Sequence, residues 1–414
     1  MTALHDFSLT DPAVQKCPFP YYEKMRSEAP VHKDPATGFY IVAKDSLIRE
    51  AGANFEVFSA QVDQRRARAN NVSAEVDRIY AESGWPKVST IIYQDPPVHT
   101  RFRKLVDRVF TPARLRQMEE YLIALVEDLI AQFKHRGECD FLREFAIPLP
   151  IYVIADALGV PREDLERFKA WSDATVEPLG LLITPEREIE CAHLVVEFQH
   201  YFAAVAEARR AEPKNDLVSD LVHAQVGGEQ PLSTPELLSI IQQLLIAGNE
   251  TTTNALASAM LVLIRTPGLA DAMRGDIPRI KTFVEEVLRL ESPIQGLFRK
   301  TTCDTTLGGI PIPKDSIVCL RYGSGNRDGD VWDKPDDIDL ERKSAARHLA
   351  FSSGNHYCVG AQLARGEMLW AINSLLNNLD NMRLPDGFEP RYQPSVVFRA
   401  LEALPLRFDA RTPE

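Results

Sequence analysis

The chain has 414 residues, of which 45% are hydrophobic and 26% charged, a balance typical of a globular protein that buries a large core. Its formal net charge of -12 disfavours binding to nucleic acid and to anionic lipid, because both carry negative charge themselves. Met1 to Pro20 has neither the basic start nor the apolar middle of a secretory signal, so we expect a cytoplasmic protein with six reduced cysteines.

The first half of the chain predicts two short strands followed by long amphipathic helices. Residues that favour strands occur near Val31 and at Phe39 to Val42. Apolar residues then recur at helical spacing in Gln117 to Phe133 and from about Ile189 to Arg209. Helices are therefore expected to dominate this half.

A capping box marks the start of the most informative helix. Ser233 and Glu236 form that pattern, and Pro235 suits the first turn. The apolar pattern continues to about Arg265, so the helix would span roughly 33 residues or ~50 Å. Apolar residues on nearly all its faces place it in the protein core, not across a membrane. The polar run from Ala247 to Thr252 predicts either a hydrated kink or a bend that makes room for a ligand.

The last third of the chain predicts a few further short strands. Pro311 and Pro313 confine the first of them to a sheet edge, because proline cannot donate to a ladder. The sequence has no regular strand–helix alternation, no GxGxxG motif and no internal repeat. We therefore expect residues 1–414 to form one mostly α domain with a long central helix and small β-sheets, with residues 1–10 as a peripheral segment. The further strands are expected around Ile310 to Ile312, at Ile317 to Leu320 and near Val396 to Phe398.

A turn-rich segment from Phe351 to Gly360 precedes a helix predicted from Ala361 to about Asn377. Cys358 lies just before that helix, where unpaired backbone N–H groups stabilise a thiolate and lower the cysteine pKa. Such a cysteine serves as a nucleophile or a metal ligand, and a buried structural cysteine is the alternative. Gly354 and Gly360 allow the backbone to fold around the sulfur and to approach a flat cofactor.

This segment resembles the cysteine-ligand loop of the cytochrome P450 family, whose pattern is F-x-x-G-x-H-x-C-x-G. Ser352 stands where many members have glycine. Two further stretches are similar to family motifs. The stretch Ala247–Thr252 is similar to the oxygen-binding groove, and Glu286–Arg289 is similar to the ExxR motif. Arg342 is similar to the arginine that completes the ion-pair network of that motif. The resemblance extends from about Pro20 to Phe408, and implies the P450 fold and a haem–thiolate monooxygenase.

The resemblance also implies the cofactor, heme b (iron protoporphyrin IX), and the residues that hold it. Cys358 would be the metal ligand. The haem propionates would contact His99, Arg103, Arg299 and His356. The rest of the expected cofactor-binding set is Phe351, Ala247, Gly248 and Gly360.

Two catalytic residues match the acid–alcohol pair of the family. Thr251 would hold dioxygen and a water by hydrogen bonds, and Glu250 would relay protons from solvent. O2 would be the co-substrate, and one of its oxygen atoms would enter a small hydrophobic organic molecule.

The substrate pocket implied by the resemblance is apolar. Gln295 is a candidate polar anchor. Arg65, Arg66 and Arg68 are candidates for recognising a carboxylate at the entrance, although a solvated loop is the commoner role of such residues. The expected lining residues are Ile91 to Tyr93, Leu179 to Ile183, Ile241, Leu244, Leu245, Ala247, Gly248, Ile294, Leu297, Phe298, Val397 and Phe398.

Electrons must come from outside the chain, because it contains no cysteine spacing for an iron–sulfur cluster and no length for a fused reductase. We expect NAD(P)H to supply them through a reductase and a separate ferredoxin-type carrier, and we expect the protein to be a monomer. A basic patch could dock this carrier, although a solvated charged face is the alternative for each of its residues. The candidate residues are Arg101, Lys104, Arg108, Arg347 and Arg365.

Three other functions account for these residues less well. A peroxygenase would use hydrogen peroxide directly, but such relatives typically lack the acid–alcohol pair present here as Glu250 and Thr251. A haem sensor without turnover would leave an apolar pocket beside a proton relay unexplained. A catalytic cysteine without haem would require a His/Asn partner set, and would not predict His99, Arg103 and Arg299 together.

Overall fold

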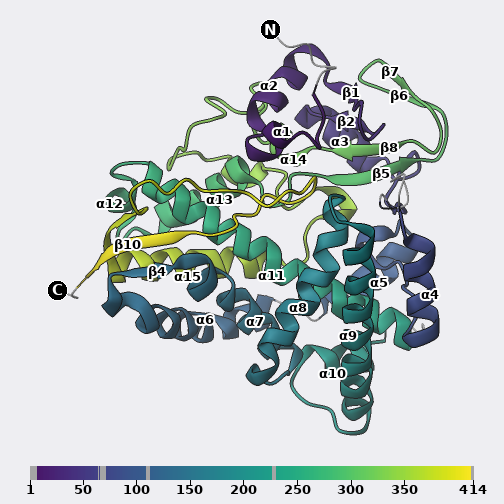
Figure 1. Cartoon of the computed structure of the whole chain (residues 1–414), viewed down its shortest axis with the longest axis horizontal. Coiled ribbons are helices and arrows are strands. Elements are labelled where there is room, and N and C mark those ends of the chain that lie inside the picture. Colours follow the sequence, from purple (N-terminus) through teal and green to yellow (C-terminus); the bar gives the residue numbers. More distant parts are fainter. Residues whose placement is uncertain (1–6, 64, 66–70, 109–111, 226–229, 412–414) are drawn as a thin grey trace.

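A computed structural model shows a helical protein with small sheets at two of its edges, and describes residues 7–63, 65, 71–108, 112–225 and 230–411 (Figure 1). The helices are α1 (Pro12–Lys16), α2 (Phe19–Glu28), α3 (Asp45–Ala53), α4 (Ser73–Ser83), α5 (Val98–Asp107), α6 (Pro112–Phe133), α7 (Pro148–Leu158), α8 (Leu165–Val176), α9 (Pro185–Ala211), α10 (Leu217–His223), α11 (Thr234–Arg265), α12 (Leu269–Met273), α13 (Ile277–Glu291), α14 (Tyr322–Gly325) and α15 (Ala361–Asn378). The strands are β1 (Val31–Lys33), β2 (Tyr40–Val42), β3 (Phe58–Ser59), β4 (Glu138–Asp140), β5 (Leu297–Thr301), β6 (Thr305–Leu307), β7 (Ile310–Ile312), β8 (Ile317–Leu320), β9 (Leu379–Arg383) and β10 (Pro405–Ala410). Shorter helical turns are η3 (Ile91–Tyr93), η4 (Lys134–Arg136), η5 (Leu142–Ala146), η6 (Arg162–Asp164), η7 (Glu177–Gly180), η8 (Ala345–Arg347) and η9 (Gly354–His356).

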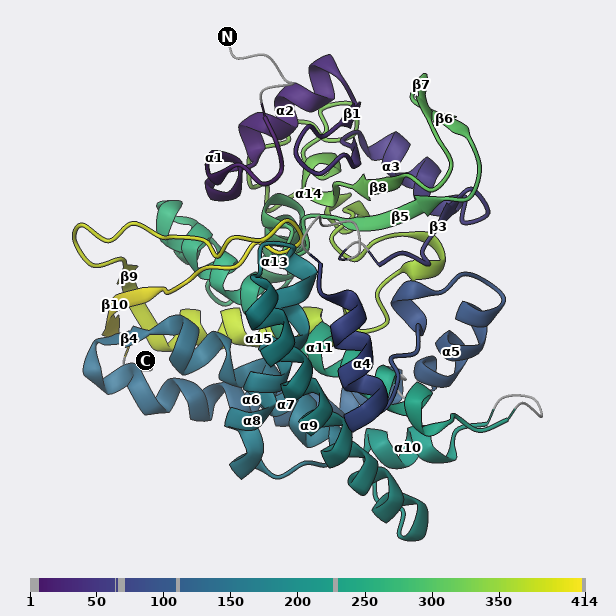
Figure 2. The same cartoon turned by 45° about the vertical axis from the view of Figure 1, so that its right-hand side comes forward.

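The central helix predicted from the capping box is α11. The carboxylate of Glu236 accepts a hydrogen bond from the backbone N–H of Ser233 at 2.8 Å, which closes the N-terminal turn. From there the helix runs for 32 residues, ~48 Å at about 1.5 Å per residue. It packs against α7, α8, α13 and α15, so most of its side chains are buried (Figures 1 and 2). In the part of the chain that the structure describes, no helix is long and apolar enough to cross a membrane.

Most of the predicted elements are confirmed, and one predicted strand is wrong. The amphipathic patterns correspond to α6 and α9, and the early strands to β1 and β2. Near Val396, however, only an isolated bridge forms, between Ile294 and Phe398. The Ser395 hydroxyl accepts hydrogen bonds from the backbone N–H groups of Val397 and Phe398 at 3.2 and 3.0 Å. These local bonds compete with a strand ladder, so a turn forms instead.

The larger sheet has the order β1-β2-β8-β5-β3, with β2 and β8 parallel and the other pairs antiparallel. It lies with α1 to α3 beside the helical part, while the sheet β4-β10-β9 lies near the C-terminus (Figure 1). The strand that carries Pro311 pairs only with β6, in agreement with its predicted edge position. Strand β5 matters most for the site, because two of its side chains, Leu297 and Arg299, face the main cavity.

Candidate active site

A cavity of about 260 Å³ lies where α11, α15 and the loop before α15 meet. Its walls are mostly apolar, and Cys358 is part of its surface. The lining residues from the predicted sets are Ile91, Ile92, Tyr93, Leu179, Leu244, Ala247, Gly248, Thr251, Ile294, Leu297, Arg103, Arg299, Phe351, His356, Cys358, Gly360, Val397 and Phe398.

The predicted pocket list was wrong at positions whose side chains point into the core. Ile241 and Leu245 are fully buried, one helical turn apart, and pack against α8 to α10, whereas Leu244 and Gly248 face the cavity. A helix turns about 100° per residue, so neighbouring apolar positions can face opposite ways. The prediction that Phe298 lines the cavity is also wrong, because successive side chains of a strand point to opposite faces. Leu297 and Arg299 face the cavity, so Phe298 between them points away and packs edge-on against Phe39. The stretch from Leu179 to Ile183 contributes only Leu179.

Cys358 lies at the cavity wall, three residues before the first residue of α15. Its backbone N–H donates to the carbonyl of Phe351 at 2.9 Å, which closes the loop around the sulfur. A side chain at Gly360 would place its Cβ 4.0 Å from Sγ, so glycine leaves the face of the sulfur open. Burial raises the pKa of the Cys358 thiol, although the Gly360 N–H and the charges of Arg103 and Arg365 act to lower it. The expected lowering by the helix start is therefore outweighed by burial.

A buried thiol with a raised pKa is a poor free nucleophile near neutral pH. A metal ion bound to the sulfur would keep it deprotonated in the same position. The environment of Cys358 therefore fits metal ligation better than the alternative of a catalytic cysteine without haem.

The backbone before Cys358 adopts left-handed conformations at two positions. Ser352 has φ 60° and Gly354 has φ 63°. This geometry explains why glycine suits position 352, since a Cβ is strained there. The Ser352 hydroxyl lies 3.1 Å from the hydroxyl of Tyr322, a contact that glycine could not make.

A group of basic side chains lies near Cys358: Arg103, Arg299 and His356 line the cavity, whereas His99 is buried behind its wall. His99 on α5 and His356 in the loop have their ring centroids 4.6 Å apart, and the Nε2 atom of each is buried without a hydrogen-bond partner. Arg299 is 4% exposed, its guanidinium donates to the Phe298 carbonyl at 2.8 Å, and no carboxylate among the described residues lies within ion-pair distance. Burial, and then the charges of Arg299, His99 and Arg103, lower the pKa of His356 to about 3.

This group is suited to an anionic ligand. Buried donors without partners are costly, and carboxylates would satisfy them. Arg103 also reaches the loop, because it donates to the Tyr357 carbonyl while its Nε pairs with Asp107 at 2.7 Å. The donor set therefore fits the two propionates of a haem whose iron is held by Cys358.

Thr251 and Glu250 lie on different sides of α11. The Thr251 hydroxyl donates to the Ala247 carbonyl at 2.7 Å and borders the cavity. Glu250 is not part of the cavity wall, and its carboxylate accepts from Asn254 at 3.4 Å. Burial raises the pKa of Glu250, while the charges of Lys169 and Asp173 on α8 act in opposite directions. The carboxyl thus lies between α8 and the helix that carries the Thr251 hydroxyl.

A second carboxyl was missed by the sequence reasoning. Glu367 on α15 borders the cavity, is 2% exposed and contacts Thr252 on α11. Burial raises its pKa to about 8, against the opposing effect of the Thr252 hydrogen bond. A signal was present, since Glu367 lies directly before Met368 and Leu369 in an apolar stretch of the predicted helix. A charged residue in such a run indicates a buried functional group.

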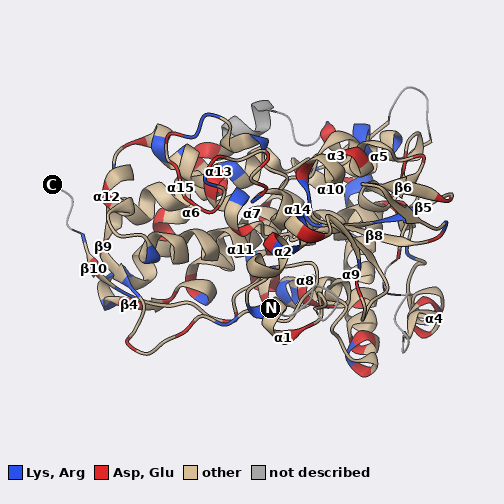
Figure 3. Ribbon diagram, turned by 90° about the horizontal axis from the view of Figure 1, so that it is seen from above, with Lys and Arg blue, Asp and Glu red and all other residues tan. Residues whose placement is uncertain are grey.

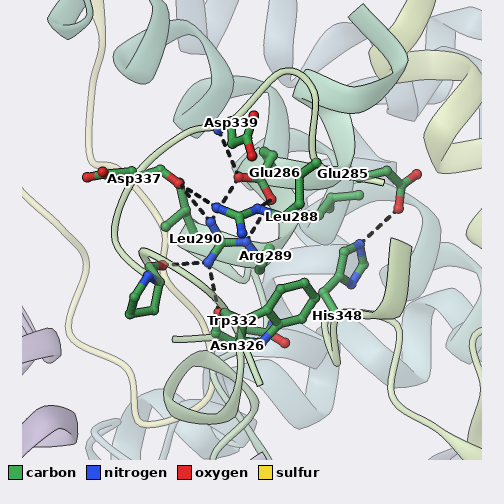
Figure 4. Close-up of polar contacts among 12 residues, drawn as sticks. Glu285, Glu286, Leu288, Arg289, Leu290, Asn326, Trp332, Asp337, Asp339 and His348 are labelled. Carbon is green, nitrogen blue, oxygen red and sulfur yellow. Dashed lines mark hydrogen bonds and ion pairs between the residues drawn. The ribbon is translucent and has the colours of Figure 1, made fainter. Parts of the chain in front are cut away.

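The ExxR pair forms a fully buried network beneath the loop (Figure 4). The Glu286 carboxylate binds Arg289 at 2.7 Å and Arg342 at 3.0 Å, and accepts the Asp339 N–H at 3.1 Å. Arg289 also donates to the Asn326 carbonyl at 3.0 Å. The predicted ion-pair partnership of Glu286, Arg289 and Arg342 is therefore confirmed.

Beside this network lies a second polar group that reaches the cysteine loop. His348 Nε2 lies 3.1 Å from Glu285, whose other oxygen binds Arg365 at 2.6 Å. The guanidinium of Arg365 in turn stacks on the ring of Phe351, 4.6 Å from its centroid. The loop is thus held from α13 through a carboxylate and an arginine.

Three of the five residues expected in a basic docking patch have partners inside the protein. Arg365 is held by Glu285, Arg101 binds Glu236 at 2.8 Å, and Arg108 donates to the Gln225 carbonyl. Lys104 and Arg347 are exposed. Basic and acidic residues are mixed along the ribbons seen in Figure 3. The docking role of these residues remains a prediction, and in the described part of the protein only Arg101 and Arg365 of the five have carboxylate partners.

The polar anchors expected for the substrate are also corrected. Gln295 does not reach the large cavity: it is 3% exposed, accepts from the Tyr22 hydroxyl at 2.8 Å and donates to the Ser292 carbonyl at 2.7 Å. Arg65 is not in a solvated loop, since its side chain is 12% exposed and binds Asp63 at 2.7 Å. Arg66 and Arg68 lie outside the described residues.

Comparison with known proteins agrees with this site. The sequence profile of the family described as Cytochrome P450 matches residues 185–402. The chain is 35% identical to a putative cytochrome P450 of Bacillus subtilis (strain 168), over 88% of each chain. The solved cytochrome P450 CYP109Q5 from Chondromyces apiculatus is 32% identical, with a TM-score of 0.86 over 99% of this chain and 100% of that one. P450BioI, solved in complex with acyl carrier protein ligated to hexadec-9Z-enoic acid, is 29% identical, with a TM-score of 0.86 over 96% of this chain and 100% of that one.

Proposed function

The chain belongs to the cytochrome P450 family of haem–thiolate monooxygenases, and on that premise we propose that it oxidises a hydrophobic organic substrate. One oxygen atom of O2 enters the substrate as a hydroxylation or related oxidation. The electrons come from NAD(P)H through a ferredoxin-type carrier and its reductase. The observation that carries this proposal is a mostly apolar cavity with Cys358 and the Thr251 hydroxyl in its wall.

The residues at the base of the cavity hold the cofactor. Cys358 supplies the sulfur ligand, and His99, His356 and Arg299 supply donors for the propionates. Haem bound through a thiolate supplies an electron-rich iron that favours cleavage of the O–O bond. Gly360 and Gly248 line the cavity without adding a side chain to it, and a Cβ at position 360 would lie 4.0 Å from the sulfur.

The polar groups of α11 move protons and hold water. The Thr251 hydroxyl borders the cavity, where it would hold dioxygen and a water molecule by hydrogen bonds. Glu250 lies on a different side of the helix, and burial raises the pKa of its carboxyl, which favours uptake of a proton that it can then release inward. The presence of this pair favours the electron-driven route over direct use of hydrogen peroxide.

The apolar lining selects the substrate. Leu244, Ile294, Leu297 and Val397 offer no hydrogen bonds from their side chains, so they favour a hydrophobic body and exclude water from it. The hexadec-9Z-enoic acid carried by acyl carrier protein in the solved P450BioI complex is a hydrophobic ligand of this general kind. A small hydrophobic organic substrate is therefore the class we propose here.

The test is reconstitution of the haem-loaded protein with a ferredoxin, its reductase and NAD(P)H. A library of hydrophobic compounds is first screened for shifts of the haem spin state, and the binders are incubated under isotope-labelled dioxygen. Products that carry one labelled oxygen and depend on NAD(P)H support the proposal. Products that form only with added hydrogen peroxide, and never from labelled dioxygen, contradict it.

A further inference from the structure

Lys87 is the one lysine among the described residues that line the cavity. It belongs to the segment between α4 and η3, which closes the cavity over the first third of α11. Its residue surface is exposed, and its ammonium lies over the ring of Tyr93, 5.6 Å from the centroid. This side chain therefore places an accessible cation in a wall that is otherwise mostly apolar.

The polar side chains that surround this segment already have partners. The Ser239 hydroxyl accepts from the backbone N–H of Val88 at 3.2 Å, and Gln243 accepts from that of Ile92 at 3.4 Å. Gln242 donates to the Thr175 hydroxyl at 2.9 Å. These bonds fix the segment against α11, and among the described lining residues of this end of the cavity Lys87 is the charged one.

Lys87 has no counter-ion within the described part of the chain: no carboxylate there lies within ion-pair distance of its ammonium. The nearest charged pair is internally neutral, because Arg65 binds Asp63 through two hydrogen bonds of 2.8 and 2.7 Å. Desolvation by the surrounding walls, and then the charge of Arg65, lower the pKa of Lys87 to about 8, while Asp63 and Asp77 act to raise it. A partly desolvated cation of this kind is stabilised by an anion that enters the cavity.

Lys87 and the oxygen-activating groups lie beside parts of α11 that are far apart along the helix. The neighbouring Val88 is bonded to Ser239, and Thr251 follows Ser239 by twelve residues on the same helix. Twelve residues of α-helix span ~18 Å at about 1.5 Å per residue. Apolar side chains, among them Leu244, line the wall between these two ends.

We propose, on the premise that this cavity is the substrate pocket of the function proposed above, that Lys87 binds the anionic head group of an amphipathic substrate. The head group is a carboxylate or a phosphate ester, and the apolar chain of the molecule extends along α11 toward Cys358. Oxidation then occurs on the chain, remote from the head group, because the two ends of the cavity are far apart. Lys87 is thus a specificity-determining residue and takes no part in the chemical step.

The experiment compares three ligands of equal chain length on the haem-loaded enzyme: dodecanoate, dodecyl phosphate and dodecanol. Binding is measured both by the spin-state shift of the haem and by calorimetry, for the wild type, Lys87→Gln, Lys87→Arg and the control Lys314→Gln. Lys314 is an exposed lysine between β7 and β8, remote in sequence from the cavity segments. The anion with the larger preference over dodecanol identifies the head group.

Loss of a hydrogen bond to a charged group weakens binding by about tenfold to a hundredfold. We therefore expect Lys87→Gln to weaken binding of the preferred anion by that factor and to leave dodecanol unchanged, with Lys87→Arg restoring most of the affinity. Equal affinity of all three ligands, or unchanged anion affinity in Lys87→Gln, would overturn the proposal. Unchanged dodecanol binding shows that the variant is folded. A failure of the proposed function would appear separately, as amphiphile binding by calorimetry without NAD(P)H-dependent oxidation of any ligand.

Discussion

Glu286 and Arg289 form an ion pair with Nε 2.7 Å from Oε1, and both side chains are completely excluded from solvent. The pair lies on the inner face of α13, where Arg342 and the backbone of Asp339 complete it. Charges are costly to bury, and they are tolerated here because nearly every donor has an acceptor. The network ties α13 to the chain segment that leads into the cysteine loop, so the position of Cys358 depends on it.

Substitution Glu286→Gln should destabilise the protein strongly, because it leaves Arg289 and Arg342 buried without a carboxylate. Removal of one partner of a buried pair costs about 3–5 kcal/mol. We expect a lower midpoint of urea unfolding and a smaller fraction of haem-loaded protein. Glu341→Gln is the matched control, because Glu341 is exposed and pairs with Arg279 on the surface at 3.3 Å. Equal stability of the two variants would show that the network is not a clamp.

Substitution Arg299→Gln should speed the loss of haem. Arg299 is a buried cation whose guanidinium borders the cavity beside His99 and His356, so it is expected to bind a propionate. A hydrogen bond to a charged group contributes about 1.5–3 kcal/mol, which corresponds to roughly tenfold to a hundredfold faster haem transfer to an apoglobin acceptor. The neighbour on β5, Lys300, is 43% exposed and provides the control Lys300→Gln. If both variants lose haem at the wild-type rate, Arg299 does not contact the cofactor.

The stability of the protein should depend on pH through Glu367. Burial raises the pKa of this carboxyl from 4.5 to about 8, so the folded state keeps its proton to higher pH than the unfolded state does. Stability therefore falls as the pH rises from about 4.5 to about 8, and this contribution changes no further above that range. Glu367→Gln should remove that part of the decline, as measured by unfolding midpoints across the range. The control Glu389→Gln, at an exposed position, should keep the wild-type dependence of stability on pH. The same dependence in Glu367→Gln would show that Glu367 does not cause the decline.

Substitution Thr251→Ala should separate electron use from product formation. The hydroxyl borders the cavity and is the group proposed to hold water beside dioxygen. Without it we expect unchanged substrate binding, a coupling of NAD(P)H to product lower by about tenfold or more, and a matching rise in hydrogen peroxide. Thr251→Ser keeps the hydroxyl and should keep most of the coupling. Wild-type coupling in the alanine variant would remove Thr251 from the proton path.

Local sequence signals predicted the parts of the fold and site that depend on neighbouring residues. The capping box of Ser233 located the start of α11, and the spacing of Glu286 and Arg289 placed both on one helix face. The loop around Cys358 was recognisable because its glycine and cysteine positions are fixed by the turn itself. The left-handed φ of 60° at Ser352 shows that this turn persists where glycine is replaced.

The features that the sequence did not predict depend on contacts between distant segments. Glu367 meets Thr252 across two helices, and Lys87 faces the cavity because Val88 bonds to Ser239 on α11. The apolar run around Glu367 indicates a buried carboxyl, but the sequence does not show which distant segment either residue meets. The apolar residues of α11 were identified correctly as buried, but the direction of Ile241 depends on which helices pack around it. The directions of these side chains are therefore set by the packing of distant segments, not by the residues next to them in the sequence.

The central claim is that Cys358 ligates a haem iron through its thiolate. The most direct test is the absorbance spectrum of the reduced, haem-loaded protein under carbon monoxide, recorded for the wild type, Cys358→Ser and the exposed control Cys17→Ser. The account predicts a Soret band at the strongly red-shifted position of thiolate-ligated haem in the wild type and in Cys17→Ser, and the loss of that band in Cys358→Ser. A wild-type band at the position of histidine-ligated haem, or a thiolate band that survives in Cys358→Ser, would contradict it.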